Sequence, residues 1–153
     1  MSTPAPDRFP NGAETWPISH DLAALRDLVH RHGQRAGLAS QRGDDLALAV
    51  NEAVTNVLDH AGGRGWVRFR VDDGFLTVDV VDRAGRLGPE ARPDERPPAG
   101  PHGYGLWVMH HLCDEVVITR GSGTSQVRLR MKRARANGRP ARHLSEATRP
   151  PSP

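Results

Sequence analysis

Apolar residues recur at intervals of three and four in several segments, which predicts helices. The first helix has Ser19 as its expected N-cap, ends between Gly33 and Gly37, and carries its stripe on Leu22, Leu25, Leu28 and Val29. The second covers about residues 41–61 before Gly62 and Gly63, with its stripe on Leu46, Val50, Ala53, Val57 and Leu58. A shorter helix is expected at about residues 104–112.

Two β-hairpins are predicted from β-rich runs that flank turn residues. Residues 66–71 and 76–81 flank Asp72-Asp73-Gly74, and residues 116–119 and 127–131 flank Gly121-Ser122-Gly123. The order helix, helix, hairpin, helix, hairpin predicts a single α/β domain, and 153 residues suffice for one such domain.

Three segments show no hydrophobic period. Residues 1–17 and 133–153 are rich in Pro, Gly, Ala, Arg and Ser and are predicted to be disordered tails. Prolines exclude both a helix and a central strand over residues 85–102, at positions 89, 93, 97, 98 and 101. A long loop inside a compact domain is often a lid, so we expect a folded domain over residues 18–132 with a lid at 85–102.

The charge distribution argues against a nucleic-acid-binding domain. The chain has a net charge of +3 and a pI near 9.9, but the segment after residue 132 carries five arginines and one glutamate. Because that segment contributes +4, residues 1–132 carry −1, without the basic clusters that nucleic-acid binding requires.

The sequence also predicts a cytoplasmic location. Cys113 is the only cysteine, which excludes an internal disulfide and suits a reducing compartment. The apolar runs are far shorter than the ~20 residues that cross a bilayer. The N-terminus lacks the basic start and apolar stretch of a signal peptide.

Two polar residues of the second predicted helix are the first candidates for chemistry. Glu52 and Asn56 are four residues apart and therefore share one helix face. A carboxamide oxygen suits Mg²⁺, and a carboxylate can orient or deprotonate a hydroxyl or a water. Taken alone, the pair also fits an ordinary solvated helix face.

Three further motifs have both a chemical and a structural interpretation. Asp82 ends an apolar strand, where its carboxylate suits a purine amine or caps the next turn. Gly103-Tyr104-Gly105 leads into a helix. Its backbone amides suit a phosphate, or its glycines simply form a flexible loop end. The hydroxyl of Thr124 suits a hydrogen bond to the edge of a nucleotide base, or the residue simply belongs to an ordinary turn. The chain lacks the P-loop motif, and its single lysine is Lys132, which excludes a P-loop NTPase.

The order of these motifs resembles the Bergerat ATP-binding fold of histidine kinases and type II topoisomerases. The matching features are Glu-x-x-x-Asn on a helix, Asp after a hairpin, a variable lid, Gly-x-Gly-Leu opening a helix, and a closing Thr. The run from Leu46 to Ala61 is most similar to the anti-sigma-factor serine kinases. The resemblance implies a two-layer sandwich, with a mixed, largely antiparallel sheet covered on one face by helices.

The resemblance also implies roles and partners. Asn56 would hold Mg²⁺, Glu52 would act as the base, and ATP would be bound by Asp82, Gly85, His102, Gly103, Tyr104, Gly105, Leu106 and Thr124. The implied activity is phosphorylation of a serine in an anti-sigma antagonist of the STAS class, which frees the kinase to hold a sigma factor. The resemblance also implies a homodimer, which neither associates with a membrane nor binds nucleic acid directly.

The chain departs from the family pattern where Ala84 and Arg86 follow Asp82, at positions where the family often has glycine. This departure leaves open an inactive ATP-binding regulator that sequesters a partner. A histidine-kinase-like ATPase module and a ligand-free interaction module also fit the pattern.

Overall fold

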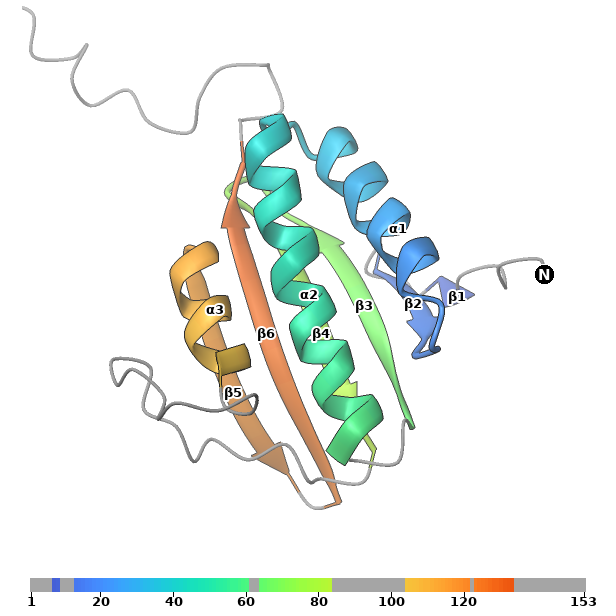
Figure 1. Cartoon of the computed structure of the whole chain (residues 1–153). Coiled ribbons are helices and arrows are strands. Elements are labelled where there is room, and N and C mark those ends of the chain that lie inside the picture. The colour runs from blue at the N-terminus through green and yellow to red at the C-terminus, as the bar shows by residue number, and fades with distance from the viewer. Residues whose placement is uncertain (1–6, 9–12, 61–63, 84–103, 122, 134–153) are drawn as a thin grey trace, which may run out of the picture.

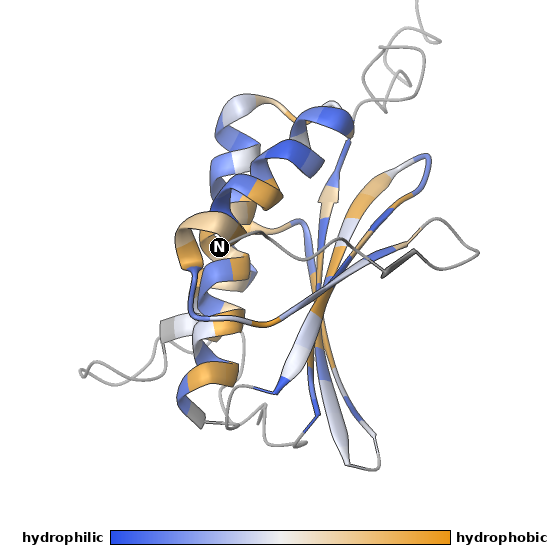
Figure 2. Ribbon diagram, turned by 90° about the vertical axis from the view of Figure 1, so that its right-hand side faces the viewer, coloured by the Kyte–Doolittle hydropathy of each residue, from blue (hydrophilic) through white to orange (hydrophobic). Residues whose placement is uncertain are grey.

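The computed structural model describes residues 7–8, 13–60, 64–83, 104–121 and 123–133. Within these residues the chain forms two layers, a six-stranded antiparallel sheet and three helices that cover one face of it (Figure 1). The helices are α1 (Leu22–Arg35), α2 (Ser40–His60) and α3 (Tyr104–Leu112). In a view from the side, all three lie on the same side of the sheet (Figure 2).

The sheet has the strand order β1-β2-β3-β4-β6-β5, and every neighbouring pair is antiparallel. Its strands are β1 (Asp7–Arg8), β2 (Glu14–Pro17), β3 (Gly65–Val71), β4 (Phe75–Asp82), β5 (Glu115–Gly121) and β6 (Thr124–Lys132). The two predicted hairpins are therefore confirmed as β3–β4 and β5–β6. The two-layer arrangement is also confirmed, and every strand pair in the described residues is antiparallel.

Helix α2 lies between the other two helices (Figure 1). It supplies most of the buried core residues that come from helices. The predicted stripe is confirmed, because Leu46, Val50, Ala53 and Val57 are all 0% exposed. This burial fixes the rotation of α2 about its axis, and hence the direction in which its polar residues face.

Helix α1 begins one residue after its cap, and the cap differs from the predicted one. Asp21 is the N-cap, since its Oδ1 accepts a hydrogen bond from the Ala24 amide at 3.0 Å. Ser19 instead accepts from the Asp21 amide at 3.2 Å and shapes the entry to the helix. Both side chains can satisfy amides at a helix start, and spacing alone does not separate them.

The prediction of a tail over residues 1–17 was wrong for the residues that form β1 and β2. Strand β2 has only four residues and ends in a proline, so it shows no readable alternation. It pairs with β3 over its whole length, and Ala13 just before it is 1% exposed. Pairing with a distant strand, rather than a local pattern, makes this segment a strand.

Strand β4 is buried on both faces. Leu76, Val78 and Val80 join the core beneath the helices, and alternation places Thr77, Asp79 and Val81 on the face without helices. The Asp79 carboxylate is 1% exposed there, and it accepts hydrogen bonds from two neighbouring strands. Arg128 Nε on β6 donates to it at 2.8 Å, and Arg68 Nη2 on β3 donates at 3.2 Å.

None of the helices in the described ranges is long and apolar enough to cross a membrane.

The start of β3 requires a residue without a side chain. Gly65 pairs with Asp82, and a methyl group at Gly65 would overlap the carbonyl oxygen of Val81. We expect Gly65→Ala to separate the two strands beside Asp82 and to lower the free energy of unfolding by roughly 1–3 kcal/mol. Gly74→Ala is the matched control, because a methyl there meets nothing closer than 3.8 Å. Urea denaturation measures both variants, and equal losses would contradict the steric explanation.

His32 makes stability depend on pH. Its ring is 8% exposed, stacks on Phe69 at 4.0 Å, and its Nε2 lies 3.3 Å from Glu14 Oε2. Burial lowers the pKa of His32 below its usual 6.5, and Glu14 opposes part of that effect. Because the folded state favours the neutral ring, this contribution is complete above pH 6.5 and declines as the pH falls through the lowered pKa.

The measurement is the free energy of unfolding at about pH 7.5 and about pH 5.5 for the wild type and His32→Phe. Phenylalanine keeps an aromatic ring on Phe69 but cannot take a proton. The loss of stability on acidification should be smaller in the variant, and an unchanged loss would assign the pH dependence to other groups.

Candidate functional site

The first turn of α3 packs directly on the two predicted polar residues of α2. A methyl group at Gly105 would lie 3.1 Å from Asn56 Nδ2 and 3.4 Å from Glu52 Oε2. Gly105 is buried, and Glu52 and Asn56 are both half-buried. A methyl group at position 105 would push the Asn56 amide aside by a few tenths of an ångström, so glycine gives the closest approach of the two helices here.

A second pair of polar side chains lies in the sheet. Asp82 is the last residue of β4 and is 0% exposed, on the helix side of the sheet because Val80 precedes it at strand period. Its register partner on β6 is Ser125, which is 1% exposed and whose Oγ donates to Asp82 Oδ2 at 3.4 Å. A buried carboxylate beside a hydroxyl is the arrangement that the adenine interpretation of Asp82 requires.

The hydroxyl beside Asp82 therefore belongs to Ser125 and not to Thr124. Thr124 is exposed at the start of β6, and alternation turns it to the opposite face of the sheet, with its Oγ1 near Gly121. The signal for Ser125 is present in the sequence. Val127, Leu129 and Met131 are the apolar half of the strand, and the same alternation extended backward reaches Ser125.

The two pairs lie toward the same end of the two-layer sandwich. The end of α2, the start of α3, the end of β4 and the turn between β5 and β6 all face the lower part of the molecule in Figure 1. The elements that carry the two pairs are far apart in sequence, and these ends of them lie on the same side of the domain.

The remaining predicted site residues are placed less completely. Gly85, His102 and Gly103 lie outside the described residues, so the structure does not test their predicted roles. Tyr104 is the first residue of α3. Leu106 is half-buried and packs against the hydrophobic core, which gives it a structural role in seating the helix.

The donor set at this end of the domain suits a magnesium nucleotide. Among the described residues, no group of three or more His, Cys, Asp or Glu side chains is placed to hold a metal ion. Mg²⁺ in nucleotide sites uses one or two protein oxygens together with phosphates and waters. The Asn56 carboxamide, half-buried beside the start of a helix, fits that limited role.

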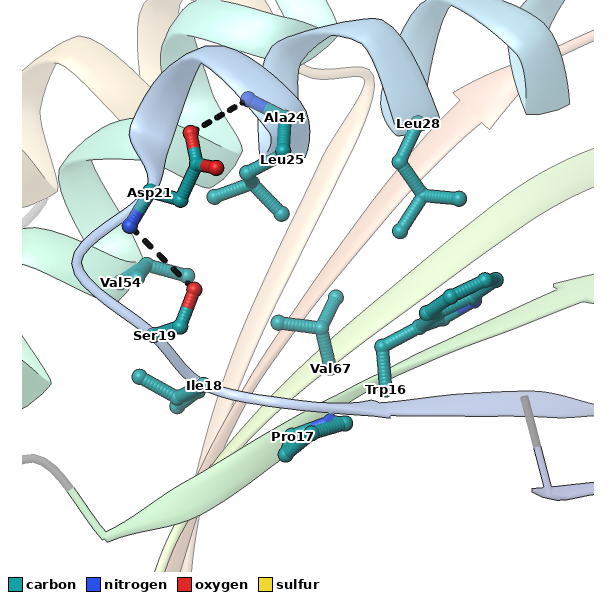
Figure 3. A pocket seen from close by; sticks show the side chains of 10 residues that line it. All are labelled: Trp16, Pro17, Ile18, Ser19, Asp21, Ala24, Leu25, Leu28, Val54 and Val67. Atoms are coloured by element: carbon teal, nitrogen blue, oxygen red, sulfur yellow. Dashed lines mark hydrogen bonds between the residues drawn. The ribbon is translucent and has the colours of Figure 1, made fainter. Parts of the chain in front are cut away.

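Two other features of the described residues lie apart from this site. An apolar cavity of about 80 Å³ between β2, α1 and β3 is lined by Trp16, Ile18, Leu25, Leu28, Val54 and Val67, with the Asp21 cap at its edge (Figure 3). It includes none of the predicted site residues. Cys113 is buried, and burial raises the pKa of its thiol to about 12, so it is not a nucleophile at neutral pH.

Comparison with known proteins agrees with this geometry. Residues 17–131 match the family model of the histidine kinase-like ATPase domain, and the chain belongs to that family. The serine-protein kinase RsbW of Bacillus pumilus is 32% identical over 112 residues, which cover 59% of this chain and 69% of that protein. The RsbW of Bacillus subtilis is 31% identical over 110 residues, with the same coverage of 59% and 69%. The predicted resemblance is thereby confirmed.

Solved structures show the same fold. The RsbU and RsbW domains of Rv1364c from Mycobacterium tuberculosis superpose with a TM-score of 0.58 at 21% identity, over 85% of this chain and 32% of that one. The histidine kinase domain of a blue-light activated kinase from Erythrobacter litoralis gives 0.51 at 20% identity, over 86% of this chain and 65% of that one. The predicted fold class is confirmed.

The two hydroxyls at the start of β6 can be told apart by substitution. We expect Ser125→Ala to weaken ATP binding about fivefold, because in the adenine interpretation it removes a hydroxyl beside Asp82 whose hydrogen bond to the base is worth about 1 kcal/mol. Thr124→Ala should change the affinity less than about twofold, since its hydroxyl is exposed on the other face. Calorimetric titration measures both, and a larger effect of Thr124→Ala would show that the threonine hydroxyl binds the base.

Proposed function

We propose that this chain binds Mg-ATP at this end of the domain and transfers the γ-phosphoryl group to a serine of a STAS-type anti-sigma antagonist. The observation that carries the proposal is the contact of Gly105 with both Glu52 and Asn56. This contact brings the start of a helix, where phosphate is favoured, against a carboxylate and a neutral oxygen ligand.

Each group has a role that follows from its place. Asp82 accepts a hydrogen bond from the adenine amine, and the Ser125 hydroxyl bonds the base edge beside it. The first amides of α3 face the phosphates, because a helix start carries unpaired N–H groups and partial positive charge. Asn56 would hold Mg²⁺, which supplies charge neutralisation when bound. Gly85, His102 and Gly103 would complete the nucleotide site.

The transfer step then requires a base near the phosphates. The serine oxygen attacks the γ-phosphorus, its proton passes to Glu52, and the bond to the β–γ bridging oxygen breaks to release ADP. Phosphoryl transfer depends mainly on positioning and charge neutralisation, so Glu52 orients and deprotonates a nucleophile that the site already holds in place.

The partners in this proposal come from the relatives and not from the site. Proteins named serine-protein kinase RsbW are the relatives that match this chain, which supports a protein serine as the acceptor. We further propose that the chain sequesters a sigma factor, forms a homodimer and is located in the cytoplasm. The exposed side of residues 19–32 or the β5–β6 hairpin would form the dimer contact.

The test separates the base from the scaffold. Glu52→Gln keeps the shape of the side chain and removes its basicity, so phosphotransfer should fall by about 100-fold or more while ATP still binds. Asp59→Asn makes the same chemical change at an exposed position of the same helix and should leave both quantities unchanged. The measurements are transfer of labelled phosphate to candidate STAS proteins and calorimetric binding of ATP.

The outcomes distinguish a kinase from a regulator without activity. ATP binding by the wild type without transfer to any STAS protein would identify the inactive, sequestering regulator that Ala84 and Arg86 leave open. Full transfer activity in Glu52→Gln would remove Glu52 from the chemistry.

A further inference from the structure

Helix α3 packs on the core through Met109 and is also contacted at both of its ends. The helix has nine residues, too short to be stable by itself in water. In the described part of the chain it is connected only at its C-terminal end, through Cys113 and Asp114 to β5. Gly105 at the other end rests on Glu52 and Asn56.

Arg42, in the first turn of α2, holds the C-terminal end of α3. Its Nη1 donates to the carbonyl of Leu112, the last residue of α3, at 3.2 Å. Its Nη2 donates to Asp114 Oδ2 at 2.7 Å. The same carboxylate oxygen accepts the backbone amide of Lys132 at 2.8 Å. One guanidinium therefore connects α2, α3, the start of β5 and the end of β6.

We propose that Arg42 is a positioning residue that sets where the N-terminal amides of α3 stand relative to Glu52 and Asn56. This inference rests on the proposed phosphate site at the start of α3. Gly105 and Leu112 are about 10 Å apart along the helix axis. A tilt of about 5° at the Arg42 end would therefore move the amides by about 1 Å, and misplacement of that size weakens catalytic and phosphate contacts strongly.

The geometry of the contact calls for arginine. The two bonds of Arg42 leave from different nitrogens of one planar group and reach a carbonyl and a carboxylate at once. A lysine can keep the ion pair with Asp114, but its single nitrogen does not span both acceptors in the same way. Arg42→Lys is therefore a conservative variant that tests the bridge while keeping the charge.

The experiment compares affinities for Mg-ATP and for adenosine in the full chain by calorimetry. Adenosine reports on Asp82 and Ser125 in the sheet, whereas ATP also reports on the amides of α3. We expect Arg42→Ala to weaken Mg-ATP binding about tenfold or more and adenosine binding less than about twofold. The affinity of Arg42→Lys for Mg-ATP should fall between those of the wild type and Arg42→Ala. If the alanine variant does not fold, the lysine variant tests the inference by itself.

Arg133→Ala is the matched control. The guanidinium of Arg133 also bridges two acceptors, the Ala36 carbonyl at 2.9 Å and the Asp72 carbonyl at 2.8 Å, but at the end of α1. Arg133→Ala should lower the melting temperature, as Arg42→Ala should, and it should leave the ratio of ATP affinity to adenosine affinity unchanged.

The possible failures are distinguishable. If Arg42→Ala weakens ATP and adenosine binding by the same factor, or if Arg133→Ala lowers the affinity ratio equally, Arg42 contributes only to general stability and the inference is wrong. If the wild type binds ATP but transfers no phosphate, the kinase proposal fails and the positioning role stands. A wild type that binds no Mg-ATP overturns both.

Discussion

The site depends on one contact, between Gly105 in the first turn of α3 and the polar residues Glu52 and Asn56 of α2. Three features produce it together: glycine at position 105, the rotation of α2 set by its buried stripe, and a short helix seated beside it. None of these has a chemical meaning alone. Together they bring the start of one helix against a carboxylate and a carboxamide, in the half-buried setting where both oxygens remain reachable.

The sheet supplies a second, independent constraint. Asp79 lies between guanidiniums of β3 and β6, and the hydrogen bond to Asp79 raises the pKa of Arg128. Removing one partner of such a buried cluster is costly, so the cluster opposes a slip of either neighbouring strand. The register held in this way sets Ser125 opposite Asp82 at the end of the same strands. An ionic cluster on the face without helices thus helps to place the polar pair on the helix face.

Local patterns in the sequence are sufficient for the helices, both hairpins and the pair Glu52 and Asn56, because periods of 3.6 and 2 decide which face each side chain takes. They are insufficient where contacts with residues distant in sequence determine the structure of a segment. Strand β2 exists because it pairs with β3, and the cap of α1 depends on which of two oxygens reaches the amide. The contact at Gly105 joins residues about fifty positions apart, which no local pattern contains. Thr124 and Ser125 are adjacent hydroxyls that the motif does not separate, and only the strand alternation does.

The two halves of the site differ in how firmly they are held, and this difference has a functional consequence. Asp82 and Ser125 belong to the interior of a paired sheet and are almost fully buried, so the proposed base-binding half is built into the fold itself. The proposed phosphate-binding half depends on a short helix that Met109 anchors in the core and that a few side-chain contacts hold at each end. A nine-residue helix has fewer restraints than strands that are paired on both sides, so the proposed phosphate half is the part that ligands or partners can shift most easily. Under the proposed function, such a domain keeps its nucleotide while the arrangement at the phosphates changes, as alternation between the two proposed partners would require.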